Sequence, residues 1–504
     1  MPEMTKEILN QKSLLYEENI DDWNLFTTVF ESGKNLIDYA LFKYEFEKTT
    51  THEDRLKDGF IFNPGRGIIN VFNFYLTETE PVRELGKLDE DELWKMFIKD
   101  SDLKGTNYDD LLNEGQKMAS VNGAVGILVN KPMNPGGSVA SAIKYGIYPY
   151  LALYSLQNIY EWKFERNKET HRVELTFLKL REEDGTYHFW YKDRWEIWRY
   201  EPRGEHKDDK PKKIDEGDNP LGEIPFFWMI NLKRSANWYL GTSDLVEIAR
   251  IVCSIARDLS NGQEVIKMAG FPMLRLPMME NKESMPIGDA ESEEDGDQES
   301  SPRTVHYFPP DFGEAGKPDW MPTEIFEPIQ AVLMWIDAKI TQCFQIALLS
   351  GIHGQRSGES AESGLKLRYE FKQLFSVLSK KSDNITEAEL SILKFWLKWS
   401  AKEELFSKIK VTRPKKFSLD DLAVALNNIF VACRNVVSKT FRVQAMDQAA
   451  EYTLPNMSDE TREKIHNENE ANTPDMPPLF ESQKDDLRNQ SGDPGDLVRP
   501  ADET

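Results

Sequence analysis

Hydrophobic residues in the first 130 positions recur mainly at helical spacing, beginning with the stripe from Leu9 to Phe30. Further along, short apolar runs stand between polar and glycine-containing segments. The predicted elements in this part are helices through 1–60, a turn leading into an apolar strand or helix over 60–75, short helices over 89–97 and 108–120, and a strand over 123–130.

Residues 147–200 change to a two-residue alternation and carry many β-branched and aromatic side chains. The pattern predicts strands over 173–180, 187–191 and 194–200, with the sequence EDG at 183–185 as a turn. The polar run 201–219 predicts a loop, and the apolar run 224–231 predicts another strand.

Two long helical stripes then flank an insert that is rich in proline. The first stripe covers 244–269, where Asp244 and Glu247 have the spacing of a capping box, and it stops at Gly270-Phe271-Pro272. The second begins near Glu327-Pro328 and runs to about 350. Strand-like runs at 273–276 and 304–308 bracket the acidic segment 289–299, which predicts a flexible loop.

After the second stripe the chain reads as a glycine-rich loop followed by helices and a polar tail. Thr386 and Glu389 have capping-box spacing, which predicts a break between two helices. The expected elements are a loop over 351–364, helices over 365–380, 386–399, 419–437 and 440–451, and a disordered, proline-rich tail after 474.

The two long stripes together indicate assembly. Helices that flank a compact insert run antiparallel, and 22–26 residues give each a length of about 33–39 Å. Both stripes are wider than one partner helix covers. Packing against the same pair in neighbouring copies would bury the rest, and repeated head-to-tail contacts of this kind close into rings.

The composition gives the net charge of the chain and indicates the redox compartment in which it works. The chain has 62 Lys and Arg against 86 Asp and Glu, a net charge of -24. A protein that binds duplex DNA through its phosphates is normally basic. Either this chain does not act on nucleic acid, or DNA moves past it without binding tightly. Cys253, Cys343 and Cys433 stand apart in apolar helical runs, which favours small core residues in a reducing compartment. No signal peptide or membrane-spanning segment is expected.

The order of parts resembles bacteriophage portal proteins, which have a wing, a stem of two helices, a clip, a tunnel loop and a crown. The stretches that carry the resemblance are 241–274, 328–350, SGESAESGLKLRYEFKQL at 357–374, VVSKTFRVQAM at 436–446 and the acidic HNENE at 466–470. The acidic insert 289–299 is not a general feature of that family.

The resemblance implies an α+β fold whose wing is mixed α/β, with an antiparallel two-helix stem, a small β clip and a helical crown. The implied boundaries are wing 1–240, stem helix 241–270, clip 271–323, stem helix 324–350, tunnel loop 351–364, wing helices 365–410, crown 411–473 and disordered tail 474–504.

The resemblance also implies a dodecameric ring at one capsid vertex of the virion, assembled in the host cytoplasm. Its implied partners are further copies of the chain, the major capsid protein, the terminase, the tail adaptor and, transiently, double-stranded DNA. It implies no membrane, no cofactor and no enzymatic activity. His353, Gln355 and Arg356 lie in the expected tunnel loop, where Arg356 could pair with phosphate and Gln355 could hydrogen-bond it. An ordinary exposed loop is the alternative for this segment.

Enzymatic motifs are weak in this sequence. The glycine-rich loop lacks the GK[ST] ending of a P-loop, and in GESAE at 358–362 Glu362 stands where a nucleophile elbow needs glycine. Only 7 His occur, without a zinc-type cluster. Trp190, Trp195 and Trp198 are interpreted as strand packing rather than a sugar platform. A carbohydrate-active hydrolase and a virion component without a DNA channel remain the alternative functions.

Overall fold

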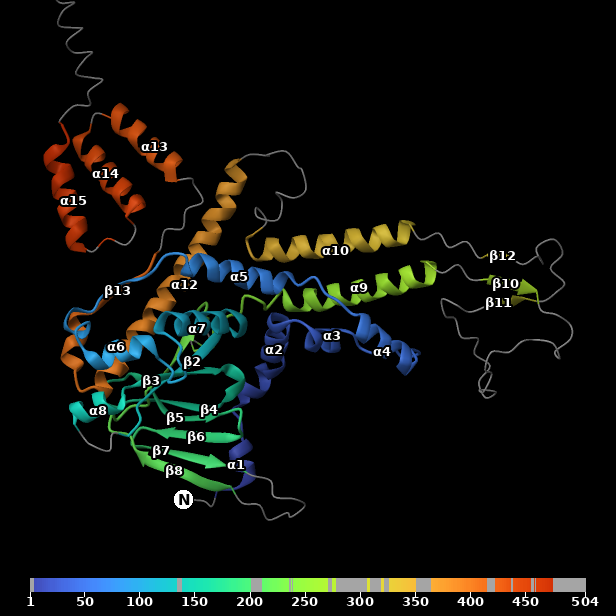
Figure 1. The fold of residues 1–504 in the computed structure, drawn as a ribbon, viewed down its shortest axis with the longest axis horizontal. Helices are drawn as coiled ribbons and strands as arrows, with labels where there is room; N and C mark the ends of the chain where they lie inside the picture. The colour runs from blue at the N-terminus through green and yellow to red at the C-terminus, as the bar shows by residue number, and fades with distance from the viewer. Residues whose placement is uncertain are drawn as a thin grey trace, which may run out of the picture. The chain divides into compact units, whose positions relative to one another are not determined.

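The computed structural model describes most of the chain as a mixture of helices and strands (Figure 1). It divides into two compact units, 1–73, 112–128 and 153–374 in the first, and 74–111, 129–152 and 375–504 in the second. The described residues are 4–133, 138–200, 211–234, 237, 239–270, 274–277, 306–308, 319–320, 326–349, 364–414, 422–436, 438–454, 457 and 459–474.

The N-terminal part of the first unit is helical, as the periodicity predicts. The hydroxyl of Ser13 caps the second helix by accepting from the Tyr16 amide. The sequence allows either a strand or a helix for 60–75, and the structure has a helix that begins at Pro64. The helices are α1 (Lys6–Asn10), α2 (Leu14–Glu31), α3 (Lys34–Ala40), α4 (Thr49–Asp58) and α5 (Pro64–Thr77).

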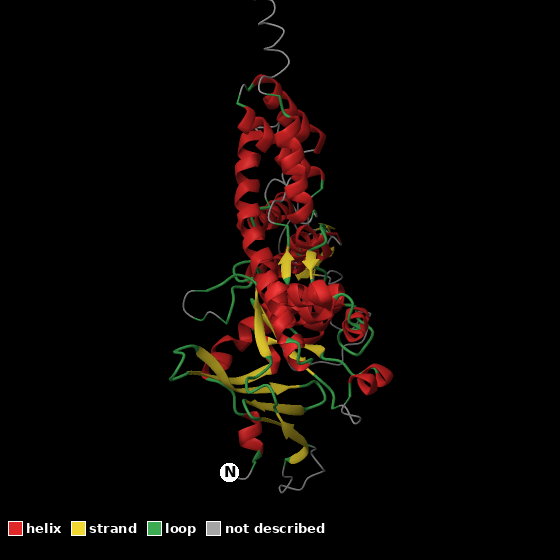
Figure 2. Ribbon diagram, turned by 90° about the vertical axis from the view of Figure 1, so that its left-hand side faces the viewer, coloured by secondary structure: helices red, strands yellow, loops and turns green. Residues whose placement is uncertain are grey.

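A twisted, five-stranded antiparallel sheet follows (Figure 2). Its strands occur in sequence order as β4 (Ile159–Arg166), β5 (Val173–Arg181), β6 (Thr186–Tyr191), β7 (Arg194–Arg199) and β8 (Lys212–Asp218). Gly185, at φ +80°, makes the turn between β5 and β6. The prediction of a loop through 201–219 is wrong for β8, because an edge strand can be polar along its whole length. Residues 201–210 lie outside the described part.

A second sheet has three strands in the order β3–β2–β9. They are β2 (Ala124–Asn130), β3 (Tyr150–Ser155) and β9 (Phe226–Ile230). β2 pairs antiparallel with β9, with Gly126 opposite Trp228. A Cβ added to Gly126 would lie 2.3 Å from the ring of Phe226, so glycine is needed for this close packing.

Two long helices of the first unit flank a small sheet, as the sequence predicts. They are α9 (Ala249–Gly270) and α10 (Phe326–Ile346). Between them in sequence, β10 (Leu274–Pro277) pairs parallel with β11 (His306–Phe308) and antiparallel with β12 (Asp319–Trp320). The sequence predicts the first two of these strands and misses the third. The acidic segment 289–299 lies outside the described residues.

The predicted start of the first long helix is wrong. Residues 244–248 form turns, and the α-helix begins at Ala249. The Asp244 carboxylate accepts from the Asn231 side chain at 3.0 Å. The hydroxyl of Ser243 instead accepts from the Leu245 amide at 2.9 Å.

The second unit packs α6 against one long helix. Trp94, Phe97, Tyr108 and Trp396 form its aromatic core, with the rings of Trp94 and Trp396 5.0 Å apart. A two-stranded ribbon joins β1 to β13. The elements of the second unit include β1 (Val82–Glu84), α6 (Glu92–Lys99), α8 (Val139–Tyr145) and β13 (Lys410–Thr412). The helices α7 (Tyr108–Asn122) and α12 (Gly364–Trp399) each have residues in both units.

The predicted break at Thr386 is also wrong, because α12 continues through it as one helix of 36 residues. The hydroxyl of Thr386 donates to the Ser382 carbonyl one turn earlier, at 2.9 Å. The carboxylate of Glu389 receives arginine side chains instead of an amide at a helix start. Both groups that suggested a helix cap therefore have other partners.

Three helices form a C-terminal group in the second unit (Figure 1). They are α13 (Leu422–Asn435), α14 (Lys439–Thr453) and α15 (Asp459–Asn472). The sequence predicts the first two and misses α15. None of the described helices combines the length and apolarity that crossing a membrane requires.

Candidate subunit interface on helices α9 and α10

Helices α9 and α10 lie side by side through a narrow apolar seam (Figure 1). Ile255, Leu259 and Ile336 are buried at its centre, and Val332 and Ile340 pack against them. At Gly262 the helices approach closely, because a Cβ there would lie 3.4 Å from Val332. The contact is a single stripe on each helix.

A partly buried ion pair joins the two helices and shows their register. The Lys339 ammonium group donates to the carboxylate of Asp258 and, at 2.7 Å, to the hydroxyl of Ser254. The Gly262–Val332 contact lies further along α9 and earlier along α10. The two helices therefore run antiparallel, which confirms the prediction for this pair.

Three large apolar side chains of α10 are exposed, among exposed polar residues such as Gln330, Asp337 and Gln345. Leu333, Met334 and Trp335 are 56%, 73% and 60% exposed, and on α9 Val265 and Ile266 are exposed as well. Successive residues of a helix point about 100° apart, so these side chains are spread around α10 and do not share one face. Of the predicted α10 stripe, Leu333 is left exposed by α9, and the expectation that each stripe exceeds what one partner helix covers stays a prediction.

The base of α9 is held to the three-stranded sheet by close backbone contact. Gly123 and Gly241 face each other so tightly that a Cβ on Gly241 would lie 2.0 Å from the Gly123 carbonyl oxygen. Ser243 donates to the Val121 carbonyl at 2.5 Å, and Asn231 donates to the Thr242 carbonyl at 2.9 Å. These contacts anchor the segment that leads into α9 within the first unit.

All three cysteines are buried, as the sequence predicts. Cys343 lies on α10 with 0% exposure, and burial raises its pKa to about 11. Burial also raises the pKa of Cys253 on α9 and of Cys433 on α13. The thiols are therefore protonated and unreactive at neutral pH.

The three tryptophans of the five-stranded sheet do not share one surface. Trp190 is buried and stands opposite Trp195 in the register of β6 and β7. Trp198 lies on the other face, because it shares the side-chain alternation of Glu196 and donates to it at 2.9 Å. The interpretation of Trp190 as strand packing is confirmed.

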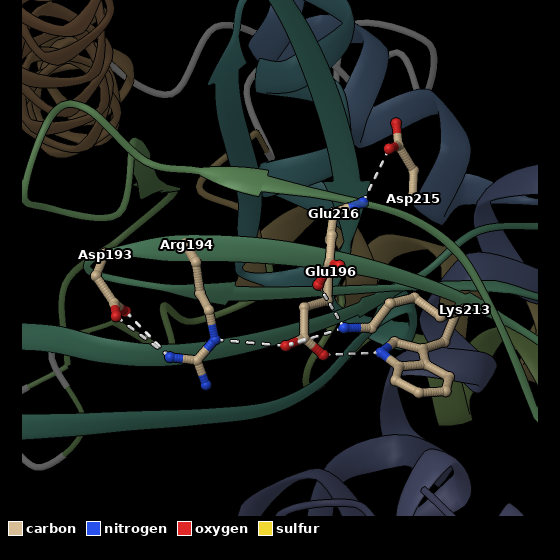
Figure 3. Close-up of polar contacts among 7 residues, drawn as sticks. Asp193, Arg194, Glu196, Lys213, Asp215 and Glu216 are labelled. Carbon is tan, nitrogen blue, oxygen red and sulfur yellow. Dashed lines mark hydrogen bonds and ion pairs between the residues drawn. The ribbon is translucent and has the colours of Figure 1, made fainter. Parts of the chain in front are cut away.

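Glu196 is the centre of a polar cluster on that sheet (Figure 3). Its side chain is buried, Arg194 donates to it at 3.4 Å, and the Lys213 ammonium lies 3.6 Å away. Burial alone would raise the pKa of Glu196, but the Trp198 hydrogen bond and the two cations outweigh it and lower the pKa. The carboxylate is therefore ionised and held by its neighbours, an arrangement that joins β7 to β8.

The predicted tunnel-loop residues His353, Gln355 and Arg356 lie outside the described residues, as does the tail after 474. Within the described part, no three His, Cys, Asp or Glu side chains gather closely enough to hold a metal ion. The helix-pair surface is the site that the structure does describe. Sequence reasoning predicts its apolar stripe from the spacing on α10 and misses the Lys339–Asp258 pair.

Comparison with known proteins gives partial likenesses among solved structures. No protein-family model matches the chain, and no curated protein matches it. Among solved structures it is similar to a chain from the neck of an empty GTA particle computed with C6 symmetry, at 9% identity and a TM-score of 0.41. The match covers 80% of this chain and 94% of that chain. A score of this size does not establish a shared fold, so function must be argued from the residues above.

Proposed function

We propose that this chain is a portal protein, the subunit of a ring-shaped channel at one capsid vertex through which phage DNA enters and leaves. The observation that carries the proposal is the antiparallel α9–α10 pair, in which α9 leaves Leu333, Met334 and Trp335 of α10 exposed. A surface of this kind is stabilised when another protein covers it. Identical copies are the simplest cover, because each brings the same helix pair.

The surrounding elements suit the same role. The small sheet of β10, β11 and β12 comes between α9 and α10 in sequence, where a clip would stand at the tip of a stem. The three-helix group α13–α15 occupies the sequence position of a crown. In this proposal residues 351–364 are the tunnel loop, and His353, Gln355 and Arg356 face passing DNA.

The acidic balance fits a conduit rather than a DNA clamp. With a net charge of -24, a ring of such chains repels phosphate, and repulsion lets DNA slide. The proposed partners are the major capsid protein around the ring, the terminase during packaging, and the tail adaptor afterwards. The proposed role is structural and requires no cofactor or catalysis.

The test is the mass and shape of the purified protein. We expect light scattering to give a mass near twelve times the 58.3 kDa monomer, and negative-stain images to show rings with a central hole. Met334→Asp should reduce assembly without unfolding the chain, since that side chain is 73% exposed. Tyr145→Asp on α8, also exposed, is the matched control. A clean monomer at micromolar concentration would remove the basis of the proposal.

A further inference from the structure

Arg442 is a buried cation in the three-helix group α13–α15 (Figure 1). It lies on α14, four residues after the cap residue Ser438, and is 4% exposed. An arginine is almost never buried to this extent unless an anion pairs with it. Among the described residues, no carboxylate lies within ion-pair distance of the Arg442 guanidinium. The anion is therefore expected from outside the described residues.

The hydrogen bonds of Arg442 leave one of its donors without a partner. Nη2 donates to the carbonyl of Pro474, the last residue that the structure describes. Nε is buried and has no hydrogen-bond partner among the described residues. A guanidinium binds a carboxylate through two parallel N–H groups, so a carboxylate at this side of Arg442 would satisfy the remaining donor.

Helix α15 holds Pro474 at this position. Asn469 of α15 donates to the carboxylate of Asp447 on α14 at 2.7 Å, and the chain leaves α15 only a few residues later. The next residue in the sequence is Asp475. Consecutive Cα atoms are about 3.8 Å apart, so a short side chain on that residue can reach the same guanidinium.

We propose that Arg442 is a carboxylate-binding site and that its occupant is the side chain of Asp475. Because Asp475 is tethered beside the guanidinium, it has a high effective concentration there compared with free anions. Side chains of a helix lean toward its N-terminus, where the helix dipole also favours an anion. The pair fastens the start of the segment 475–504 to the three-helix group. This site does not depend on ring assembly, so the portal proposal stands or fails separately.

Amide hydrogen exchange of the full-length protein tests the pair. Asp475→Asn removes the charge and keeps the size of the side chain. We expect exchange in α15 to become about tenfold faster or more, the effect of losing a hydrogen bond to a charged group. Asp485→Asn, which removes an acidic residue of the same segment, is the matched control and should exchange like the wild type. Equal rates in Asp475→Asn and the wild type would overturn the assignment of Asp475.

Added acetate separates the binding site from its occupant. In Asp475→Gly, which leaves space for a free carboxylate, acetate should restore slow exchange in α15, and chloride at the same ionic strength should not. No response to acetate would overturn carboxylate binding at this site. In Arg442→Gln, adding Asp475→Asn should cause no further change. Faster exchange in Arg442→Gln but not in Asp475→Asn would show that a carboxylate from another source occupies the site. The Asp475 variants decide the question even if Arg442→Gln does not fold.

Discussion

Replacing Glu389 by Gln tests a buried charge network in the described part of the second unit. The Glu389 side chain is 0% exposed and lies on α12. One of its carboxylate oxygens accepts from Arg83, and the other accepts from Arg413 at 2.6 and 3.2 Å. The network ties the β1–β13 ribbon to the long helix, and the substitution removes its only buried anion while keeping its shape.

The expected cost follows from what each arginine retains. Arg83 keeps Asp109, whose carboxylate accepts from it at 2.5 Å. Arg413 is buried and loses the carboxylate that holds it. Removing one partner of a buried ion pair costs about 3–5 kcal/mol, and the remaining Asp109 contact places the expected loss near the lower end.

The assay is the free energy of unfolding from urea titration, with amide hydrogen exchange to show which segments open. We expect loss of protection in α12 and β13 for Glu389→Gln. Asp109→Asn is the control, because it removes the other anion from the same Arg83 but its side chain is 55% exposed. An exposed pair contributes about 0–1 kcal/mol. Equal losses from the two variants would refute the reasoning from burial.

Four further predictions concern the stem, pH and the channel. Ile336→Ala should lower the free energy of unfolding by about 2–4 kcal/mol and reduce the hydrogen-exchange protection of α10. An unchanged free energy of unfolding would show that the apolar seam does not hold the two helices together. Because the pKa of Glu196 is lowered, its stabilisation is present above pH 4.5 and is lost as pH falls through the folded pKa; the melting-temperature gap to Glu196→Gln should close there. Asp447 raises the pKa of His466, so this contact stabilises below pH 6.5 and is lost as pH rises through the raised value; NMR titration should show the pKa falling in Asp447→Asn. Arg356→Glu should leave ring assembly intact and reduce DNA packaging, and unchanged packaging would contradict the tunnel-loop assignment.

The parts of the fold that sequence predicts are those where one physical rule dominates. In β5, β6 and β7 the aromatic residues pair across neighbouring strands, as Phe177 does with Tyr191 and Trp190 with Trp195, and α9 and α10 repeat every three to four residues because each packs on the other. Prediction from sequence fails where polar contacts between side chains determine the structure. Helix α15 has no apolar stripe and is tied to α14 through His466, Asn469 and Asp447.

Local motifs mislead when a distant residue competes for the same group. Thr386 and Glu389 have the spacing of a helix cap, but the arginine that binds Glu389 from β1 is 306 residues away in sequence. The carboxylate of Asp244 likewise accepts from Asn231, and the helix begins later, at Ala249. Nothing in the local pattern signals these partners, because a capping box and a buried ion network use the same residue types.

The portal proposal rests on what the α9–α10 pair leaves open. Ile255, Leu259 and Ile336 close one side of the pair, whereas Leu333, Met334 and Trp335 stay exposed on the rest of α10. Large apolar side chains left open in this way are stabilised when another chain covers them. A repeating contact between identical copies has only two outcomes, a closed ring or an open filament, so the mass and the images of the purified protein decide between them.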